Sequence, residues 1–235
     1  MQNIWAGVCI LQSFCRILQM SLVAKCRYPP RPRGIQPFAF WHGRCLEPGN
    51  NRHEKEWGKM KGIIFTELVR FMEKVQSPEF ADQVISGAAL PNDGAFTSIG
   101  NYPSEYALAM VGQASEQSGI EATELCRLFG KYLYDRFNIL YPHIMESYNS
   151  AESLLTHVGS HIHTEVCVLY PDARPPQVTA DVQDGQTVIH YHSHRPMAAI
   201  AHGLVQGCMD HYGDQRSLEW ECAVDGKSAI FTIKG

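Results

Sequence analysis

The sequence of 235 residues lacks any run of about 20 uninterrupted apolar residues, which is the length that a membrane-spanning helix needs. The longest apolar candidate, residues 1–15, is interrupted by Gln2, Asn3, Gln12 and Ser13. Its start also lacks the basic residues and the small-residue cleavage site of a secretory signal. We therefore expect a cytoplasmic protein that does not enter a membrane.

Paired metal-binding cysteines are also missing. None of the eight cysteines forms a C-x-x-C pair, so the sequence gives no support for a tetrahedral zinc site. We expect reduced and mostly buried thiols, as is usual in a cytoplasmic protein. The chain has no motif for a catalytic nucleophile, no Gly-rich phosphate loop and no pair of catalytic carboxylates. These absences argue against an enzyme.

Charge is divided unevenly along the chain. Residues 1–59 carry nine Lys/Arg and three Asp/Glu residues, a net charge of +6, whereas residues 60–235 carry 11 and 21, a net charge of −10. A strongly acidic folded part repels the phosphates of nucleic acids. We therefore expect no nucleic-acid partner.

Residues 1–59 also differ from the rest in composition. They contain five prolines and show no sustained period of 2 or 3.6 residues, whereas a helical pattern begins at Met60. The codons for Lys55 and Glu56 permit AAGGAG, the core of a bacterial ribosome-binding site, three codons before Met60. We therefore predict that residues 1–59 are a non-native leader from a mis-assigned start; a genuine disordered extension is the alternative. Residues 60–235 are expected to form the functional domain.

The hydrophobic pattern beyond residue 60 predicts an α+β fold. Apolar residues first recur at helical spacing and later alternate in short segments. Helices are expected at residues 60–72, 77–86, 103–117, 122–140, 142–147, 153–170 and 196–212, and strands at 177–182, 187–193, 218–224 and 229–233. This order predicts a helical N-terminal part and a small antiparallel sheet with helices packed against it.

One predicted strand carries two different polar faces. Tyr191, Ser193 and Arg195 would share one face because side chains alternate along a strand. Two hydroxyls and a guanidinium suit an anionic ligand with two carboxylates. The other face would carry three histidines that offer an alternative interpretation as a metal site: His190, His192 and His194.

The helix expected at residues 153–170 contains a candidate metal ligand. Its apolar stripe consists of Leu155, Val158, Ile162, Val166 and Leu169. His163 lies beside this stripe, whereas His161 lies about 200° further round the helix, on the face of His157. Only one of His161 and His163 can face the core, and the helix phase favours His163. His157 and His161 are better explained as a solvated pair than as a zinc site.

Several short motifs occur in a fixed order along the chain. They are MKGIIFTE at 60–67, HIHTEV at 161–166, LYPDA at 169–173, PP at 175–176 and Y-x-S-x-R at 191–195. Together they resemble the haem-nitric oxide/oxygen-binding (H-NOX) family, here a bacterial stand-alone sensor related to the haem domain of soluble guanylate cyclase. The resemblance extends from Met60 to about Gly235. The combination of the last motif with an upstream helical histidine and a Pro-Pro pair is highly specific.

The resemblance implies a haem b cofactor buried between the helical part and the sheet. By this resemblance His163 is the proximal ligand of a ferrous iron, and Pro176 presses on the macrocycle and distorts it. The residues implied to hold the haem propionates are Tyr191, Ser193 and Arg195. These groups suit a dicarboxylate cofactor with an apolar body and an axial imidazole. The alternative function is a non-haem metal-binding protein that uses His190, His192 and His194.

The resemblance also implies a preference among gases. In oxygen-binding relatives a distal tyrosine donates a hydrogen bond to bound O₂, and Ile200 stands at that position here. Leu68 and Leu133 replace supporting polar residues. Bound O₂ needs a distal donor, whereas NO binds ferrous iron strongly without one, so we expect NO selectivity. The sequence leaves open whether another tyrosine enters the distal side: Tyr132, Tyr134 or Tyr141.

The implied function is sensing and not catalysis. NO, and also carbon monoxide, would be the gas ligands, and NO would weaken or break the bond between iron and the histidine. The chain ends at Gly235 without a kinase, cyclase or methyl-accepting domain. We therefore expect the signal to pass to a separate histidine kinase or cyclic-di-GMP enzyme.

Overall fold

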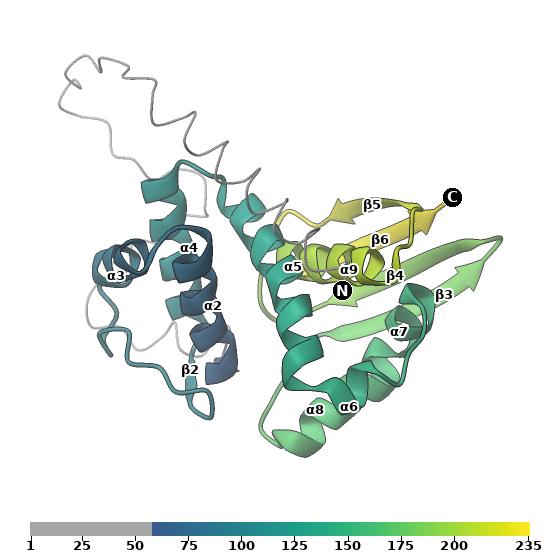
Figure 1. Cartoon of the computed structure of the whole chain (residues 1–235), viewed down its shortest axis with the longest axis horizontal. Helices are drawn as coiled ribbons and strands as arrows, with labels where there is room; N and C mark the ends of the chain where they lie inside the picture. The colour runs from purple at the N-terminus through teal and green to yellow at the C-terminus, as the bar shows by residue number, and fades with distance from the viewer. Residues whose placement is uncertain (1–57) are drawn as a thin grey trace, which may run out of the picture. The chain divides into compact units, whose positions relative to one another are not determined.

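The computed structural model describes residues 58–235, and these form one compact unit (Figure 1). Except for Gly58 and Lys59, the predicted leader lies outside the described residues, as do Cys9, Cys15, Cys26 and Cys45. The described chain combines helices with small antiparallel sheets, so the predicted α+β class is confirmed.

The described chain begins with a short strand pair. Strand β1 (Lys59–Lys61) pairs antiparallel with β2 (Asn101–Pro103), and helix α2 (Gly62–Val75) follows β1. The expectation that the helix begins at Met60 was therefore wrong by two residues. The turn into α2 requires Gly62, because a Cβ atom there would lie 1.8 Å from the carbonyl oxygen of Thr97.

Two further helices complete the N-terminal part. Helix α3 (Pro78–Gly87) begins after Ser77, whose Oγ accepts a hydrogen bond from the backbone N–H of Phe80 at 3.1 Å. Helix α4 (Ser104–Ser118) ends at Gly119, which adopts a left-handed conformation with φ of 72°. With α2 and α5 these helices form the helical cluster, whose largest members include Phe65, Leu68, Phe71, Met110, Phe129 and Leu133.

Helices α5 (Ala122–Leu140) and α9 (Ala198–Tyr212) make the most extensive helix–helix contact in the described chain. Glycines allow their backbones to approach closely. A Cβ atom on Gly130 would lie 2.1 Å from the carbonyl oxygen of Ile200, and one on Gly203 would lie 1.9 Å from that of Arg127. The bounds predicted for α5 are confirmed.

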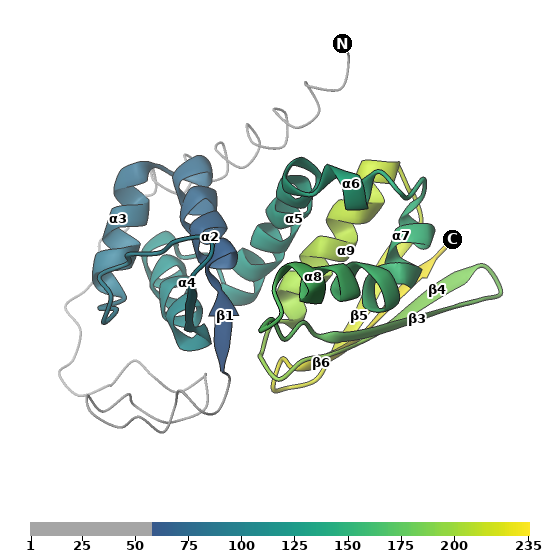
Figure 2. The same cartoon turned by 90° about the horizontal axis from the view of Figure 1, so that it is seen from below.

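The C-terminal sheet is antiparallel and has the strand order β3-β4-β6-β5. Its strands are β3 (Gln177–Gln183), β4 (Gln186–His192), β5 (Ser217–Cys222) and β6 (Ser228–Lys234). Figures 1 and 2 show that α9 crosses one face of this sheet, with the helices before β3 on the same side. The sheet cluster lies between them and includes Tyr134, Leu155, Ile189, Tyr191, Phe231 and Ile233.

The segment before the sheet differs from the expectation. Helix α6 (Pro142–Met145) is followed by α7 (Ala151–His157), the π-helical segment η2 (Val158–Ile162) and α8 (His163–Leu169). The prediction of one continuous α-helix over residues 153–170 was therefore wrong. The wider π-helical turn shifts the phase of the side chains after it. Leu169, which was expected in the buried stripe, is accordingly 47% exposed.

Two further expectations concern cysteines and membranes. Of the four described cysteines, Cys208 is buried and Cys126 is half-buried, but Cys167 and Cys222 are exposed. The expectation of mostly buried thiols was therefore wrong for two of these four residues. No helix within residues 58–235 is both long and apolar enough to cross a membrane.

Candidate functional site

His163 is the first residue of α8 and directly follows the π-helical segment. Its side chain is half-buried, and its Nδ1 is buried without a hydrogen-bond partner within residues 58–235. Burial lowers the pKa of His163, although the backbone carbonyl of Pro176 acts in the opposite direction. The imidazole is therefore neutral at pH 7, which is the form that binds a metal ion.

The neighbouring histidines have different surroundings. His161 is exposed, and its Nδ1 lies 2.6 Å from the hydroxyl of Tyr148. His157 is also exposed, and its Nδ1 lies 2.7 Å from the carbonyl oxygen of Ser153. The helix phase inferred from the sequence therefore distinguished the more buried histidine, His163, from its competitor.

The π-helical segment is held directly against the sheet. A Cβ atom on Gly159 would lie 2.0 Å from the carbonyl oxygen of Val178 in β3, so a larger residue would push the two backbones apart. Val178 lies two residues after Pro176, and His163 begins the helix that follows Gly159. This contact explains how the histidine and Pro176 become neighbours.

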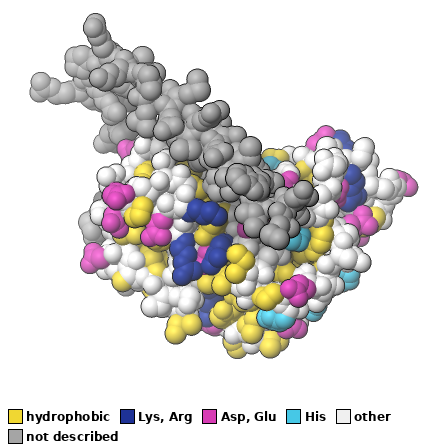
Figure 3. Space-filling view, viewed as in Figure 1, with side chains coloured by type: hydrophobic (Ala, Val, Ile, Leu, Met, Phe, Trp, Pro, Cys, Tyr) yellow, Lys and Arg dark blue, Asp and Glu magenta, His cyan; other side chains and the backbone are white. Residues whose placement is uncertain are grey.

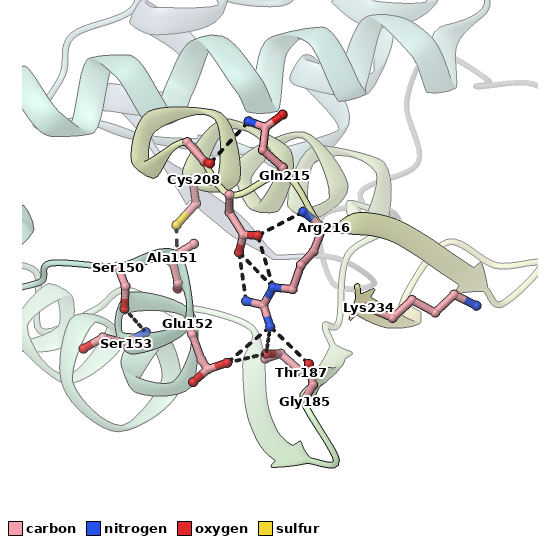
Figure 4. A network of polar contacts seen from close by, with 12 residues as sticks. Ser150, Ala151, Glu152, Ser153, Gly185, Thr187, Cys208, Gln215, Arg216 and Lys234 are labelled. Atoms are coloured by element: carbon pink, nitrogen blue, oxygen red, sulfur yellow. Dashed lines mark hydrogen bonds and ion pairs between the residues drawn. The ribbon is translucent and has the colours of Figure 1, made fainter.

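Arg216 anchors the beginning of α7 (Figure 4). Its guanidinium lies 2.8 Å from Asp214 Oδ2 and 3.3 Å from Oε2 of Glu152, which lies in the first turn of α7. The hydroxyl of the fully buried Thr187, in β4, donates to the same Glu152 oxygen at 3.2 Å. The helical segment that leads to His163 is thereby fixed to β4 and to the loop between α9 and β5.

Tyr191, Ser193 and Arg195 are all buried, with exposed fractions of 6%, 5% and 7%. Strand β4 ends at His192, so the expectation that all three residues lie on one strand was wrong. Ser193 stays beside the sheet because its backbone N–H donates to the carbonyl of Lys227 at 2.8 Å. The Ser193 Oγ accepts from the backbone N–H of Arg195 at 3.1 Å.

Tyr191 is electrostatically linked to the other two residues of the motif. Burial raises the pKa of Tyr191, whereas the hydroxyl of Ser193 and the charge of Arg195 lower it. The phenol therefore remains a hydrogen-bond donor at pH 7. The three side chains together present two hydroxyls and one cation in a buried setting.

The guanidinium of Arg195 joins three separate segments. Its Nε donates to Ser104 Oγ at 2.9 Å, its Nη1 to the carbonyl of Arg174 at 3.2 Å, and its Nη2 to the carbonyl of Lys59 at 2.5 Å. A guanidinium has five N–H donors, so two remain for a carboxylate. Burial lowers the pKa of Arg195, and a buried cation of this kind favours an anionic partner.

The three alternating histidines do not form a metal site. His190 and His192 are exposed, and His192 Nδ1 lies 2.9 Å from Ser228 Oγ. His194 lies beyond the end of β4 and is half-buried. Within residues 58–235, no group of three or more His, Cys, Asp or Glu residues is placed to hold a metal ion. The alternative interpretation as a non-haem metal protein therefore has no support from the described residues.

The three apolar residues predicted for the distal side come from three helices. Leu68 in α2 and Leu133 in α5 are 3% and 2% exposed and belong to the helical cluster. Ile200, near the start of α9, is half-buried and packs against the same cluster. The fold therefore brings all three residues into one apolar region.

The tyrosines that could supply a distal donor have other surroundings. The hydroxyl of Tyr132 donates to Glu67 Oε2 at 3.2 Å, and that of Tyr141 lies 3.3 Å from the hydroxyl of Tyr170. Tyr134 belongs to the sheet cluster and packs against the C-terminal half of α9. Ile200 lies near the opposite end of that helix.

Two polar residues near these groups were missed in the sequence. Ser104 contacts Arg195, and Glu67 is a fully buried carboxylate that contacts Arg136 and Arg70. Glu67 and Arg136 are 69 positions apart, so no local pattern connects them. Glu67 ends the MKGIIFTE motif at 60–67, but nothing in that motif indicated that its carboxylate is buried and paired.

These features define a class of binding protein. A neutral, half-buried histidine, a buried cation flanked by two hydroxyls, and an apolar region suit a planar anionic cofactor that needs one axial nitrogen ligand. Residues 61–220 match the model of the haem-NO-binding family, and the chain belongs to this family of haem-binding gas sensors. The resemblance inferred from the sequence motifs is therefore confirmed.

Solved structures of this family have the same fold. The Shewanella woodyi H-NOX protein in its Fe(II)CO state is 33% identical, with a TM-score of 0.62, and the match covers 74% of this chain and 94% of that one. The unliganded Fe(II) H-NOX protein of K. algicida is 27% identical, with a TM-score of 0.70 and coverage of 74% and 96%. The S. oneidensis H-NOX protein in its Fe(II)NO state is 20% identical, with a TM-score of 0.69 and coverage of 74% and 98%, and supports the fold alone. Among curated proteins, none matches this chain.

Proposed function

We propose that the protein is a ferrous haem b sensor of nitric oxide whose only protein ligand to iron is His163. The observation that carries this proposal is the setting of His163, a neutral, half-buried imidazole beside the backbone carbonyl of Pro176. His161, the competitor, is exposed and engaged with Tyr148. Bound haem would supply the iron that binds the gas.

The propionates of the cofactor would be held by Tyr191, Ser193 and Arg195. Arg195 offers two N–H donors beyond those used by the protein, and the hydroxyls of the other two residues add further donors. Pro176, beside His163, would contact the macrocycle and keep it distorted. The buried cation offsets the two negative charges of the cofactor.

Selectivity for NO would come from the distal side. Leu68, Leu133 and Ile200 carry no hydrogen-bond donor, so they would leave bound O₂ without the hydrogen bond that it needs, whereas NO and CO bind ferrous iron without one. The family model is that of haem-NO-binding proteins, and the 33% identical Shewanella woodyi relative has been solved in its Fe(II)CO state, which supports these two gases as ligands.

The signal would pass from His163 to a separate protein. His163 is the first residue of α8, so a bond from its imidazole to a haem iron would tie this helix to the cofactor, and a gas that weakens the bond would change how firmly the helix is held. We propose a sensor without catalytic activity of its own, which acts on a histidine kinase or a cyclic-di-GMP enzyme. We also propose that the haem-binding domain comprises residues 60–235.

An absorbance spectrum of the purified, reduced protein tests the proposed function. A haem protein shows an intense Soret band, and NO should move this band to shorter wavelength as the histidine is lost. A colourless protein that contains stoichiometric zinc would instead support the metal-binding alternative.

A further inference from the structure

Glu67 is a buried carboxylate that the proposed function does not use. It lies in α2, one residue before Leu68, and its side chain is 0% exposed. Burying a charge is costly unless it is paired, and an apolar pair often stabilises a core equally well. A buried ionic group at this place therefore calls for an explanation other than stability.

The partners of Glu67 come from two helices. Arg136 in α5 donates through Nε at 2.6 Å and through Nη2 at 3.3 Å, and Arg70 in α2 donates at 2.6 Å. Burial alone would raise the pKa of Glu67, but the hydrogen bonds and charges of the two arginines outweigh it and lower the pKa. Figure 3 shows Lys and Arg side chains gathered on this face, over the region where α2 and α5 lie in Figure 1. The carboxylate is thus ionised and clamps α2 to α5.

The clamp lies at the level of the distal residues. Glu67 immediately precedes Leu68 in α2. Its two partners in α5 are Tyr132, one position before Leu133, and Arg136, three positions after Leu133. The ring of Tyr132 packs at 5.5 Å from that of Phe71, in the helical cluster. Its hydroxyl therefore ends between the two helices that supply the distal leucines.

The hydroxyl of Tyr132 has only one proton to donate, and Glu67 accepts it at 3.2 Å. Burial, together with the charge and hydrogen bond of Glu67, raises the pKa of Tyr132 to about 12, so this proton stays on the phenol. Because the Glu67 carboxylate accepts this hydrogen bond, the Tyr132 hydroxyl has no further proton to donate to a gas ligand nearby.

We propose that Glu67 is a positioning residue for gas selectivity: it holds the Tyr132 hydroxyl within the α2–α5 clamp and so keeps the distal side free of donors. This inference rests on the proposed haem-based function. The buried charge of Glu67 keeps the hydroxyl of Tyr132 away from the bound gas. The apolar character of the distal side then depends on Glu67 as well as on the leucines.

The experiment compares haem-loaded, reduced variants by the C–O stretching frequency of their carbon monoxide complexes. The main variant is E67L/R136M, because replacing both members of the Glu67–Arg136 pair avoids an unpaired buried charge, while the Arg70 side chain is 55% exposed and stays solvated. It frees the Tyr132 hydroxyl, so the C–O frequency should fall as the hydroxyl approaches the bound gas. E67Q keeps an acceptor for Tyr132 and should retain the wild-type frequency, which also provides an answer if the double variant does not fold.

Two controls separate the proposed cause from general disturbance. Adding Y132F to the E67L/R136M variant should restore the wild-type frequency, since the donor is then gone. E124Q removes a more exposed Glu–Arg pair of the same i, i+3 spacing in α5 and should change nothing. The inference would be overturned by an unchanged C–O frequency in E67L/R136M, or by a frequency shift that remains after Y132F is added. A frequency shift in E67Q as large as that of E67L/R136M would also overturn it. The proposed function is judged separately, on whether the wild type shows a Soret band and binds NO.

Discussion

The two sides of the candidate site differ in the number of buried hydrogen-bond donors that they carry. On one side Tyr191, Ser193 and Arg195 are buried donors, and Arg195 alone makes three hydrogen bonds to separate segments. On the other side Leu68 and Leu133 are buried without polar atoms. In the proposed function, the first side would bind the cofactor by supplying hydrogen bonds, and the second would select a gas by withholding them.

Two of the three candidate tyrosines have hydrogen-bond partners for their hydroxyls, whereas the buried hydroxyl of Tyr134, in the sheet cluster, has none within residues 58–235. A buried donor without a partner is costly and will bond to whatever acceptor enters. Tyr132 and Tyr141 satisfy each hydroxyl within the protein, through Glu67 and Tyr170 respectively. An apolar distal side that selects against O₂ therefore needs apolar side chains around the gas and also partners for the hydroxyls nearby.

The largest effect should come from removing the histidine. His163→Gly should weaken haem retention by about 100-fold or more, because loss of groups that merely support a ligand already costs 10–100-fold. Haem transfer to an acceptor globin measures the change, and added imidazole should partly restore binding. His161→Ala is the matched control and should keep the wild-type spectrum. Loss of haem in the His161 variant alone would assign the ligand role to the wrong histidine.

A smaller effect is expected on the polar side. Arg195→Lys keeps the charge but loses the planar set of donors that holds Ser104 and two carbonyls together with a carboxylate. We expect haem affinity to fall about tenfold, equivalent to roughly one charge-assisted hydrogen bond. Arg127→Lys, at a more exposed ion pair of α5, serves as the control. Equal haem affinity in Arg195→Lys and the wild type would mean that the propionates bind elsewhere.

The sequence was sufficient for the parts of this comparison that depend on local pattern. The amphipathic period predicted the bounds of α5, and the motif order predicted the family. The π-helical segment was missed because the spacing of apolar residues in the sequence does not reveal where a helical turn contains an extra residue. The pairing of Glu67 with Arg136 was missed because it depends on how α2 packs against α5, a tertiary contact.

The contrast between the two sides can be weakened by adding a donor to the apolar side. Ile200→Tyr should confer weak O₂ binding, with a small effect because the new hydroxyl lacks a partner that orients it. The backbone at this position is fixed by the close approach of Gly130, so the helix should not move. Ile200→Phe adds the ring without the hydroxyl and is the control. O₂ binding by both variants would point to altered packing and not to a hydrogen bond.

The smallest effect concerns the proposed domain start. A chain shortened to begin at Met60 should fold and bind haem, but it loses two carbonyls: Gly58 accepts from Ser104 at 2.9 Å, and Lys59 accepts from Arg195. The Gly58 carbonyl also accepts from the backbone N–H of Ser104 at 3.1 Å, so three hydrogen bonds are lost, which predicts a fall in melting temperature of about 3–12 °C. A chain that begins at Gly58 after an added methionine should not show this loss. Failure of both shortened chains to bind haem would refute the proposed domain boundary.

The most direct test of the central claim is the absorbance spectrum of the reduced wild-type protein, first in air-saturated buffer and then with NO. An apolar distal side with its tyrosines held elsewhere predicts no stable complex with O₂. With NO, the Soret band should move to shorter wavelength as His163 is released. A long-lived O₂ complex in the wild type would contradict the account, because it would require a donor that reaches the gas past Leu68, Leu133 and Ile200.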